Sequence, residues 1–132
     1  MSDDRPRDYD REFTAHTTNH RARRRLGIDV GQGIVTRFVV QLEFLVDAAD
    51  EEWAPVVRYD HDAEGSEEAA HNVTEEGLHI DIYRYGEKVE SHELTPPLPA
   101  NEALNAAEEH LNNHIEGYLQ RFEQWHGFNH DP

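Results

Sequence analysis

Side chains suited to acid–base chemistry and phosphate binding lie close together in the middle of the sequence. Arg58 and Asp60 alternate along a predicted strand, and His71 stands in the loop that follows. His79 and Asp81 alternate along the next predicted strand. Residues two apart share a face of a strand, so these side chains would converge at one end of the sheet if the two strands are neighbours.

This set contains the parts of a metal-independent site for RNA cleavage. One histidine can take the proton of a ribose 2′-hydroxyl, a second can protonate the leaving oxygen, and an arginine can hold the phosphate through two nitrogens. A tyrosine, Tyr59 or Tyr83, and His61 at the start of the loop lie nearby in the sequence. The alternative is structural, because 10 of the 132 residues are histidines and Arg58 can simply pair with neighbouring carboxylates.

A second set of residues has the spacing of metal ligands. His110 and His114 are four residues apart and therefore share one face of a predicted helix. His79, Asp81 and His92 could add ligands from the sheet. The alternative is that the two helix histidines lie on a solvated flank, since the glutamate of the metalloprotease motif is missing. The chain has no cysteine, which excludes disulfides and cysteine zinc sites.

A third set is a cluster of arginines near the N-terminus, formed by Arg21, Arg23, Arg24 and Arg25. Such clusters bind nucleic-acid phosphates by releasing counterions. However, the rest of the chain is acidic and would repel a nucleic acid, and molar salt screens charges beyond about 3 Å. The alternative is that these arginines neutralise the acidic domain of their own chain or stay solvated.

The alternation of apolar and polar residues predicts the elements that would carry these sets. It indicates four strands, at residues 34–46, 53–60, 78–85 and 88–94. Pro55 suggests that the second strand is an edge strand or begins irregularly, and Gly86-Glu87 predicts a hairpin turn. Residues 101–126 repeat apolar side chains at spacings of three and four, which predicts a long helix capped by Gly127.

These elements predict an α+β fold, in which a four-stranded antiparallel meander sheet is covered by one long C-terminal helix. The single domain would span residues 26–127, with an acidic loop at residues 61–77. Residues 1–25 are rich in arginine and poor in apolar residues, which predicts a flexible arm, and residues 128–132 predict a disordered tail. The apolar stripe of the helix suits the core of a monomer or a homodimer.

The overall composition is typical of a salt-adapted protein. The chain carries 28 acidic against 12 basic residues, a formal charge of −16, and Lys88 is its one lysine. A carboxylate-rich surface stays hydrated in concentrated salt, whereas the apolar stems of lysines favour aggregation there. The composition therefore predicts a protein of a halophilic archaeon. The sequence has neither an apolar run of membrane-spanning length nor a secretory signal, so the expected location is the cytoplasm.

The stretch WAPVVRYDHDAEGSEEAAHNVTEEGLHIDIY, residues 53–83, resembles an uncharacterised haloarchaeal domain family. The core of that family runs Trp-x-Pro-Val-Val-Arg-Tyr-Asp, followed by a histidine loop and a histidine-bearing strand. More remotely, the stretch is similar to the TumE-like toxins of toxin–antitoxin modules. The toxin pattern has adjacent histidine pairs, whereas the histidines here stand singly in a longer and more acidic loop. The likeness implies catalytic roles for Arg58, Tyr59, Asp60, His71 and His79.

Together these patterns predict a toxin-like component of a toxin–antitoxin module that acts on RNA without a cofactor. The resemblance implies an antitoxin-like protein partner, and the helix stripe allows a homodimer instead. The alternative function is a non-enzymatic module that binds another protein through its exposed sheet face or its helix. A ribonuclease requires Arg58, His71 and His79 to lie close together, whereas an interaction module requires an exposed apolar patch.

Overall fold

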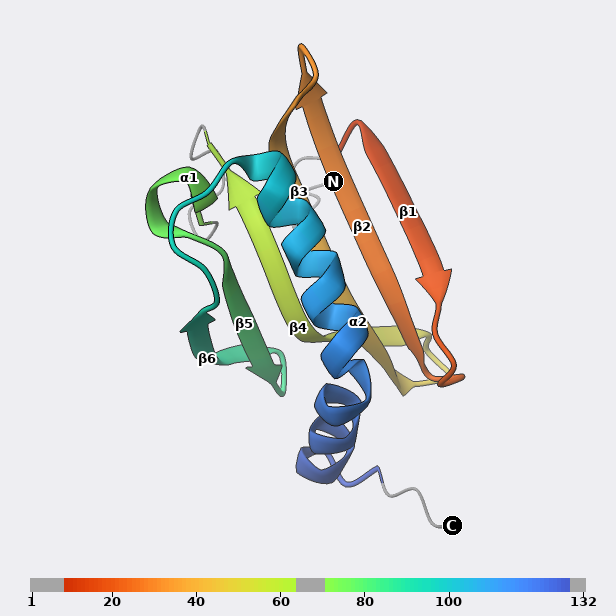
Figure 1. Ribbon diagram of the computed structural model, residues 1–132. Coiled ribbons are helices and arrows are strands. Elements are labelled where there is room, and N and C mark those ends of the chain that lie inside the picture. The colour runs from red at the N-terminus through yellow and green to blue at the C-terminus, as the bar shows by residue number, and fades with distance from the viewer. Residues whose placement is uncertain (1–8, 64–70, 129–132) are drawn as a thin grey trace.

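A computed structural model describes residues 9–63 and 71–128 of the chain. In this part of the chain, six strands form one antiparallel sheet in which each strand pairs with the next (Figure 1). A one-turn helix, α1 (Val73–Glu76), precedes the fifth strand, and a long helix, α2 (Ala100–Trp125), follows the sixth. The strands are β1 (Arg11–His16), β2 (Ala22–Gly31), β3 (Ile34–Asp47), β4 (Glu52–Asp62), β5 (His79–Arg84) and β6 (Glu87–Glu93).

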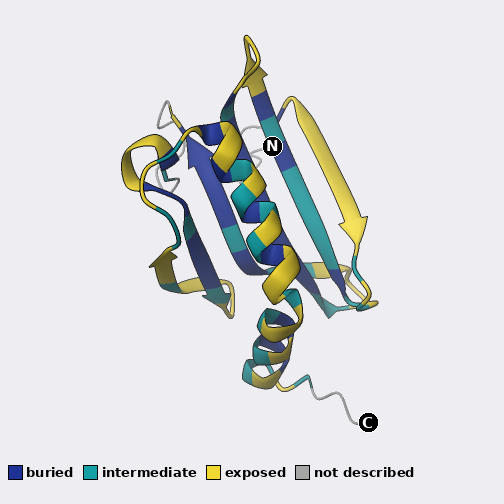
Figure 2. Cartoon of the chain, viewed as in Figure 1, coloured by how far each residue is buried: buried dark blue, intermediate teal, exposed yellow. Residues whose placement is uncertain are grey.

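One face of the sheet is apolar and is covered by α2. In β3 the alternating residues Phe38, Val40, Leu42 and Phe44 are each at most 3% exposed, as the alternation in the sequence predicts. Figure 2 shows the buried side of α2 turned to the central strands and its exposed side turned to solvent. Burying one large apolar side chain stabilises the fold by about 1.5–3 kcal/mol. The buried apolar residues of α2 are Ala100, Ala103, Ala107, Leu111, Leu119 and Phe122.

The end of α2 is tied to the β5–β6 hairpin. The helix is followed by Gly127 at a φ of 76°, the left-handed conformation of the predicted cap. The Tyr85 N–H donates to Nε2 of His126 at 2.9 Å, and the Tyr85 hydroxyl donates to the Trp125 carbonyl at 2.8 Å. The hairpin turn is formed by Tyr85 and Gly86, both at positive φ, one residue earlier than predicted. The two hydrogen bonds to the helix end explain why a tyrosine is held in that backbone conformation.

The prediction of a flexible arm is wrong for residues 11–16 and 22–25, because they form β1 and the first part of β2. The sequence of β2 does not alternate clearly because it contains three arginines, of which Arg23 and Arg25 pair with carboxylates on neighbouring strands. Arg23 Nε lies 2.7 Å from Glu43 Oε1, and Arg25 Nη2 lies 3.1 Å from Glu12 Oε1. The sheet therefore has six strands in the part of the chain that the structure describes, where four were predicted.

Other terminal and loop predictions have mixed outcomes. Phe128, predicted in the disordered tail, packs its ring 5.2 Å from that of Phe44. The predicted loop at residues 61–77 is wrong for His61 and Asp62, which extend β4, and for Val73–Glu76, which form α1. The parts of these predictions at residues 1–8, 64–70 and 129–132 lie outside the described residues.

The second predicted strand is not an edge strand, because β4 lies between β3 and β5. Pro55 pairs with Glu43 beside a shift in register, and the pairing with β5 involves Val57 and Arg58 further along. A proline is tolerated at such an irregular position because its missing N–H interrupts no regular ladder. Among the described residues, no helix is both long and apolar enough to cross a membrane.

Candidate functional site

The face of the sheet opposite α2 carries charged residues that are nevertheless buried. Asp29, Arg37, Asp60 and Asp81 are each at most 5% exposed. Arg37 Nε lies 3.0 Å from Asp29 Oδ2, and the ring of Tyr9 lies 3.8 Å from the Arg37 guanidinium. A buried charge is costly unless it is paired and hydrogen-bonded, so this face depends on its ion pairs.

Three segments meet on this charged face. Arg58 of β4 pairs in register with Asp81 of β5. Beyond that pair, the segment before α1 lies alongside β4. There the Asp62 N–H donates to the His71 carbonyl at 2.8 Å, and the His71 N–H donates to Asp60 Oδ1 at 3.0 Å. These bonds place the His71 side chain beside the carboxylates of both strands.

Local hydrogen bonds fix α1 next to this cluster. The Asn72 side chain caps the helix by accepting from the Thr74 N–H at 3.1 Å, and Glu76 Oε2 accepts from the Asn72 N–H at 2.9 Å. The Val73 N–H donates to Nδ1 of His61 at 3.0 Å. Burial lowers the pKa of His61, which keeps this nitrogen available as an acceptor.

The turn from α1 into β5 requires a glycine. Gly77 has a φ of 84°, and a Cβ at this position would overlap the carbonyl oxygen of Thr95. The turn sets the start of β5, so that His79 points back to the segment before α1. Its Nδ1 lies 3.1 Å from the Gly77 carbonyl oxygen, to which it donates.

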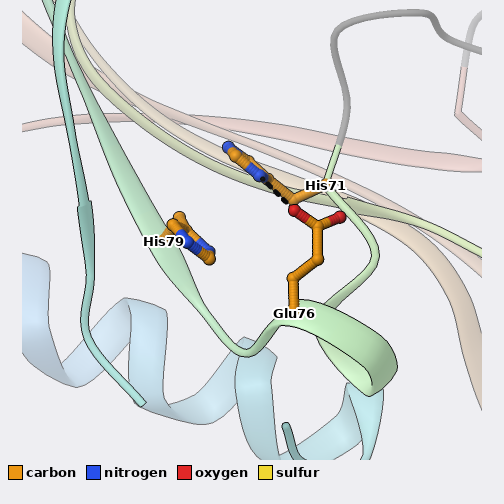
Figure 3. Close-up of side chains that lie close together, drawn as sticks. All are labelled: His71, Glu76 and His79. Carbon is orange, nitrogen blue, oxygen red and sulfur yellow. Dashed lines mark hydrogen bonds and ion pairs between the residues drawn. The ribbon is translucent and has the colours of Figure 1, made fainter. Parts of the chain in front are cut away.

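His71 lies at the centre of the cluster. Its Nε2 is 3.2 Å from each carboxylate oxygen of Asp81, and its Nδ1 is 3.3 Å from Glu76 Oε1. The His71 and His79 rings stack with centroids 4.6 Å apart and planes 5° from parallel (Figure 3). The hydrogen bond to Asp81 outweighs burial and, with the charges of Asp81 and Asp60, raises the pKa of His71 to about 9. His71 is therefore an imidazolium at neutral pH.

Asp81 is held as a carboxylate although it is buried. Burial alone would raise its pKa, but hydrogen bonds from His71 and Ser91, and the charge of Lys88, bring the pKa below its ordinary value. Ser91 Oγ donates to Asp81 Oδ1 at 2.7 Å, and Lys88 Nζ lies 3.4 Å from Asp81 Oδ2. The carboxylate thus joins β5 and β6 to His71.

Arg58 supplies a further cation at the same site. Its Nε lies 2.8 Å from Asp60 Oδ2. Burial is the largest influence and would lower the pKa of Arg58, but the charge and hydrogen bond of Asp60, together with Tyr9 and Tyr83, outweigh it and raise the pKa. Tyr83 shares this face, and burial raises the pKa of its hydroxyl, which therefore stays protonated.

The structure brings together four of the five predicted catalytic residues, Arg58, Asp60, His71 and His79. The fifth, Tyr59, belongs to the opposite face, because neighbouring residues of a strand point to opposite sides. Its hydroxyl forms a 2.8 Å hydrogen bond with His110 Nδ1 under α2, and burial raises its pKa. Tyr83, the other tyrosine considered from the sequence, is the one on the charged face.

The predicted metal ligands on the helix do not form a site with residues of the sheet. His110 is bound to Tyr59, and His114 Nδ1 lies 2.9 Å from the His110 carbonyl oxygen. His92 Nε2 lies 2.8 Å from Glu90 Oε1 on the neighbouring part of β6. In residues 9–63 and 71–128, the groups of three metal-binding side chains are His71, Glu76 and His79, and Asp60, His71 and Asp81.

Sequence reasoning missed Glu76, Lys88 and Ser91 as parts of the cluster. Glu76 lies in a segment predicted as a loop, although the run Asn72-Val73-Thr74-Glu75-Glu76 has the pattern of a capped helix start. No comparable signal exists for Lys88 and Ser91, because their contacts with Asp81 depend on the register of β5 and β6.

The four predicted nucleic-acid arginines are used inside the fold. Arg21 Nη2 donates to the Leu45 carbonyl at 2.7 Å, and Arg24 is hydrogen-bonded to the side chain of Asn112 on α2. Arg23 and Arg25 form the ion pairs of β2 described above. The contacts of Arg23 and Arg25 favour the alternative that these arginines neutralise acidic groups of their own chain, whereas Arg21 and Arg24 bind neutral groups.

Comparison with known protein families matches residues 5–128 to a family described as a domain of unknown function (DUF7718). The match spans every described element from β1 to α2. Neither a curated protein nor a solved structure is significantly similar to the chain.

Proposed function

The chain belongs to the DUF7718 family, a domain family of unknown function, and we propose that it cleaves RNA. The proposed reaction is acid–base catalysis at the cluster around His71. The observation that carries the proposal is the pair of histidines, His71 and His79, whose rings stack 4.6 Å apart. Arg58 stands on the same face as a cation for the phosphate. A base, an acid and a phosphate ligand are sufficient for this reaction without a metal.

In the proposed reaction His79 is the base. Because its Nδ1 donates to the Gly77 carbonyl, the lone pair of the neutral ring lies on Nε2. Nε2 takes the proton of the ribose 2′-hydroxyl as the 2′-oxygen forms a bond to phosphorus. His79 is partly exposed, so a substrate can reach it.

His71 is the acid of the proposal. It is protonated at neutral pH, and Asp81 holds its Nε2–H, which leaves the Nδ1–H to be transferred. The Glu76 side chain in front of Nδ1 is 48% exposed and would move into solvent by giving up its hydrogen bond from the Asn72 N–H. As the bond from phosphorus to the 5′-oxygen breaks, that oxygen takes the proton. The products are a 2′,3′-cyclic phosphate and a 5′-hydroxyl.

The alternative of a non-enzymatic interaction module has less support. The sheet face opposite α2 is lined by charged groups such as Arg37, Asp60 and Asp81, where the module would need an apolar patch. Among the described residues, the exposed large apolar ones are spread over β1, the adjoining ends of β2 and β3, and the β5–β6 hairpin. They are Phe13, Val30, Ile34, Tyr85 and Val89.

The test is cleavage of an end-labelled RNA oligonucleotide by the full chain in molar KCl with EDTA. We expect 2′,3′-cyclic phosphate ends, and no cleavage where the 2′-hydroxyl is replaced by hydrogen. His79→Ala should lower kcat by about 10²- to 10⁴-fold. The matched control is His92→Ala, which removes an exposed histidine of β6 that pairs in register with Ile80, and it should leave the rate unchanged. Intact RNA with the wild-type protein, both with and without EDTA, would refute the proposal, and cleavage only without EDTA would refute the metal-independent mechanism.

The salt adaptation and the toxin role belong to the same proposal. They are supported by the formal charge of −16, the single lysine and the resemblance of residues 53–83 to TumE-like toxins. Ellipticity measured by circular dichroism should therefore increase as KCl rises toward molar levels. Expression in a halophilic archaeon should slow growth with the wild-type chain but not with His79→Ala. Full folding in dilute buffer contradicts the first expectation, and equal growth contradicts the second.

A further inference from the structure

Three side chains around α1 offer metal-binding atoms to one small region. His71 precedes α1, Glu76 ends it, and His79 begins β5 (Figure 3). One donor atom from each lies within 4.8 Å of the other two. Two imidazole nitrogens and one carboxylate oxygen are donors that suit zinc and similar transition ions, whereas Mg²⁺ and Ca²⁺ prefer oxygen alone.

One ring nitrogen of each histidine already donates a hydrogen bond to an acceptor. His71 Nε2 faces the Asp81 carboxylate at 3.2 Å, and His79 Nδ1 faces the Gly77 carbonyl at 3.1 Å. Histidines that bind metals almost always donate their other ring N–H to a carboxylate or a backbone carbonyl in this way. The nitrogens left for a ligand are therefore Nδ1 of His71, beside Glu76 Oε1 at 3.3 Å, and Nε2 of His79.

We propose that His71, Glu76 and His79 bind a divalent transition metal ion of the zinc type, a site that does not depend on the RNA cleavage proposed above. Two parallel rings cannot direct both lone pairs at one ion, so the His79 ring must tilt relative to His71 when the ion binds, about an axis that keeps its Nδ1 at the Gly77 carbonyl. The partly exposed His79 and the 48% exposed Glu76 side chain have the freedom to do this. Three protein ligands leave a fourth position for water.

The second group of donors, Asp60, His71 and Asp81, is a poorer place for a cation. Arg58 lies 2.8 Å from Asp60, and Lys88 lies 3.4 Å from Asp81, so two positive charges already compensate these carboxylates. Both carboxylates are also buried, at 3% and 1% exposure. A metal ion there would be repelled by both cations, whereas the site around Glu76 lies at the surface.

Metal binding and acid–base catalysis would exclude each other. The ion needs the lone pair of His79 Nε2, which the base uses, and it displaces the Nδ1 proton of His71, which the acid transfers. If the chain cleaves RNA, zinc should therefore inhibit it by occupying the same side chains. This consequence rests on the proposed function, but the metal site itself does not.

The test is isothermal titration calorimetry, in which metal-free full-length protein is titrated with ZnCl₂ in molar KCl and, for comparison, with MgCl₂. We expect one zinc ion per chain and no heat from magnesium. His79→Ala and Glu76→Gln should each weaken zinc binding by at least about tenfold, whereas His92→Ala should bind as the wild type does. Glu76→Gln changes an exposed residue, so the proposal stays testable if His79→Ala does not fold. Equal zinc affinity of Glu76→Gln and the wild type would overturn the site.

The coordination itself can be read from Co²⁺ substituted for zinc. Visible absorption bands of four-coordinate Co²⁺ should develop with the wild-type protein and disappear with Glu76→Gln. Asp81→Asn, which removes the negative charge behind His71 and leaves only an amide oxygen as acceptor, should weaken metal binding by about 10- to 100-fold. Metal binding without RNA cleavage would support this site and refute only the proposed function. RNA cleavage without binding of Zn²⁺ or Co²⁺ would support the proposed function and refute the metal site.

Discussion

The two faces of the sheet are stabilised in different ways. Under α2, Phe38, Leu42 and Phe44 are excluded from water by other apolar groups. On the opposite face, Arg37 and Asp81 are equally buried, but each is compensated by charged or hydrogen-bonding partners. Apolar burial is non-directional, whereas an ion pair depends on the position of each atom. The fold therefore rests on the helix face, and the capacity for chemistry lies on the charged face.

The largest expected effect comes from breaking the helix face. Phe44 is fully buried and packs its ring 5.3 Å from that of Phe122. Phe44→Ala should lower the free energy of unfolding by about 3–5 kcal/mol, because it removes buried surface and leaves a cavity. Denaturant unfolding in molar KCl measures it. A decrease in the free energy of unfolding below about 1 kcal/mol would mean that the attachment of α2 to the sheet does not depend on the packing of Phe44 on Phe122.

A single change on the charged face should have a smaller effect on stability. Asp81→Asn keeps the shape of the side chain but removes the charge that faces His71 and Lys88. We expect a loss of about 3 kcal/mol, because the His71 imidazolium is left without its main partner. The same denaturation experiment measures it, with Glu90→Gln as a control on an exposed ion pair, which should change stability by less than about 1 kcal/mol. Equal effects of the two variants would contradict the role of Asp81.

The charged face should also make stability depend on pH. The pKa of His71 is raised to about 9 from a value near 6.5 in the unfolded chain. A raised pKa stabilises the fold fully below about pH 6.5, and this contribution is lost as the pH rises through 9. The slope is at most about 1.4 kcal/mol per pH unit. Unfolding of metal-free wild-type protein should show this decline between these two pH values, and His71→Gln should remove it. A profile shared by both proteins would assign the decline to another group.

The smallest expected effect is a loss of stability on the helix face that leaves the charged face unchanged. Tyr59→Phe removes the hydrogen bond to His110 under α2, which should cost about 1 kcal/mol. It should leave RNA cleavage and zinc binding unchanged, because Tyr59 faces away from His71. Stability and cleavage assays on one preparation test both expectations. A cleavage rate as low as that of His79→Ala would return Tyr59 to the catalytic set.

The sequence predicts those parts of the fold that have a simple period. The alternation in residues 34–46 and the helical spacing in residues 101–126 correspond to β3 and α2. The sequence does not predict β1 and β2, because their side chains are mostly polar. These strands are stabilised by residues distant in the sequence, such as Glu43, which pairs with Arg23. A single sequence does not show which distant residues form such pairs.

The candidate site could be predicted in part for the same reason. Alternation along β4 places Arg58 and Asp60 on one face, and alternation along β5 places His79 and Asp81 on one face. That these two faces are the same depends on the pairing of Arg58 with Asp81, which the sequence does not show. The same rule places Tyr59 on the other face, and the family-like motif misled the prediction because it reads along the chain rather than across the sheet. Glu76 depends on the turn of α1, whose bounds no periodic pattern marks.

In the proposed function the charged face, and not the helix face, binds the RNA. The most direct measurement is the mapping of NMR chemical shifts in molar KCl on addition of an RNA in which the 2′-hydroxyl at the cleavage position is replaced by hydrogen. We predict changes at the side chains of Arg58, His71 and His79, and none at His110 or His114. Changes confined to the helix histidines, or no changes at all, would contradict the claim.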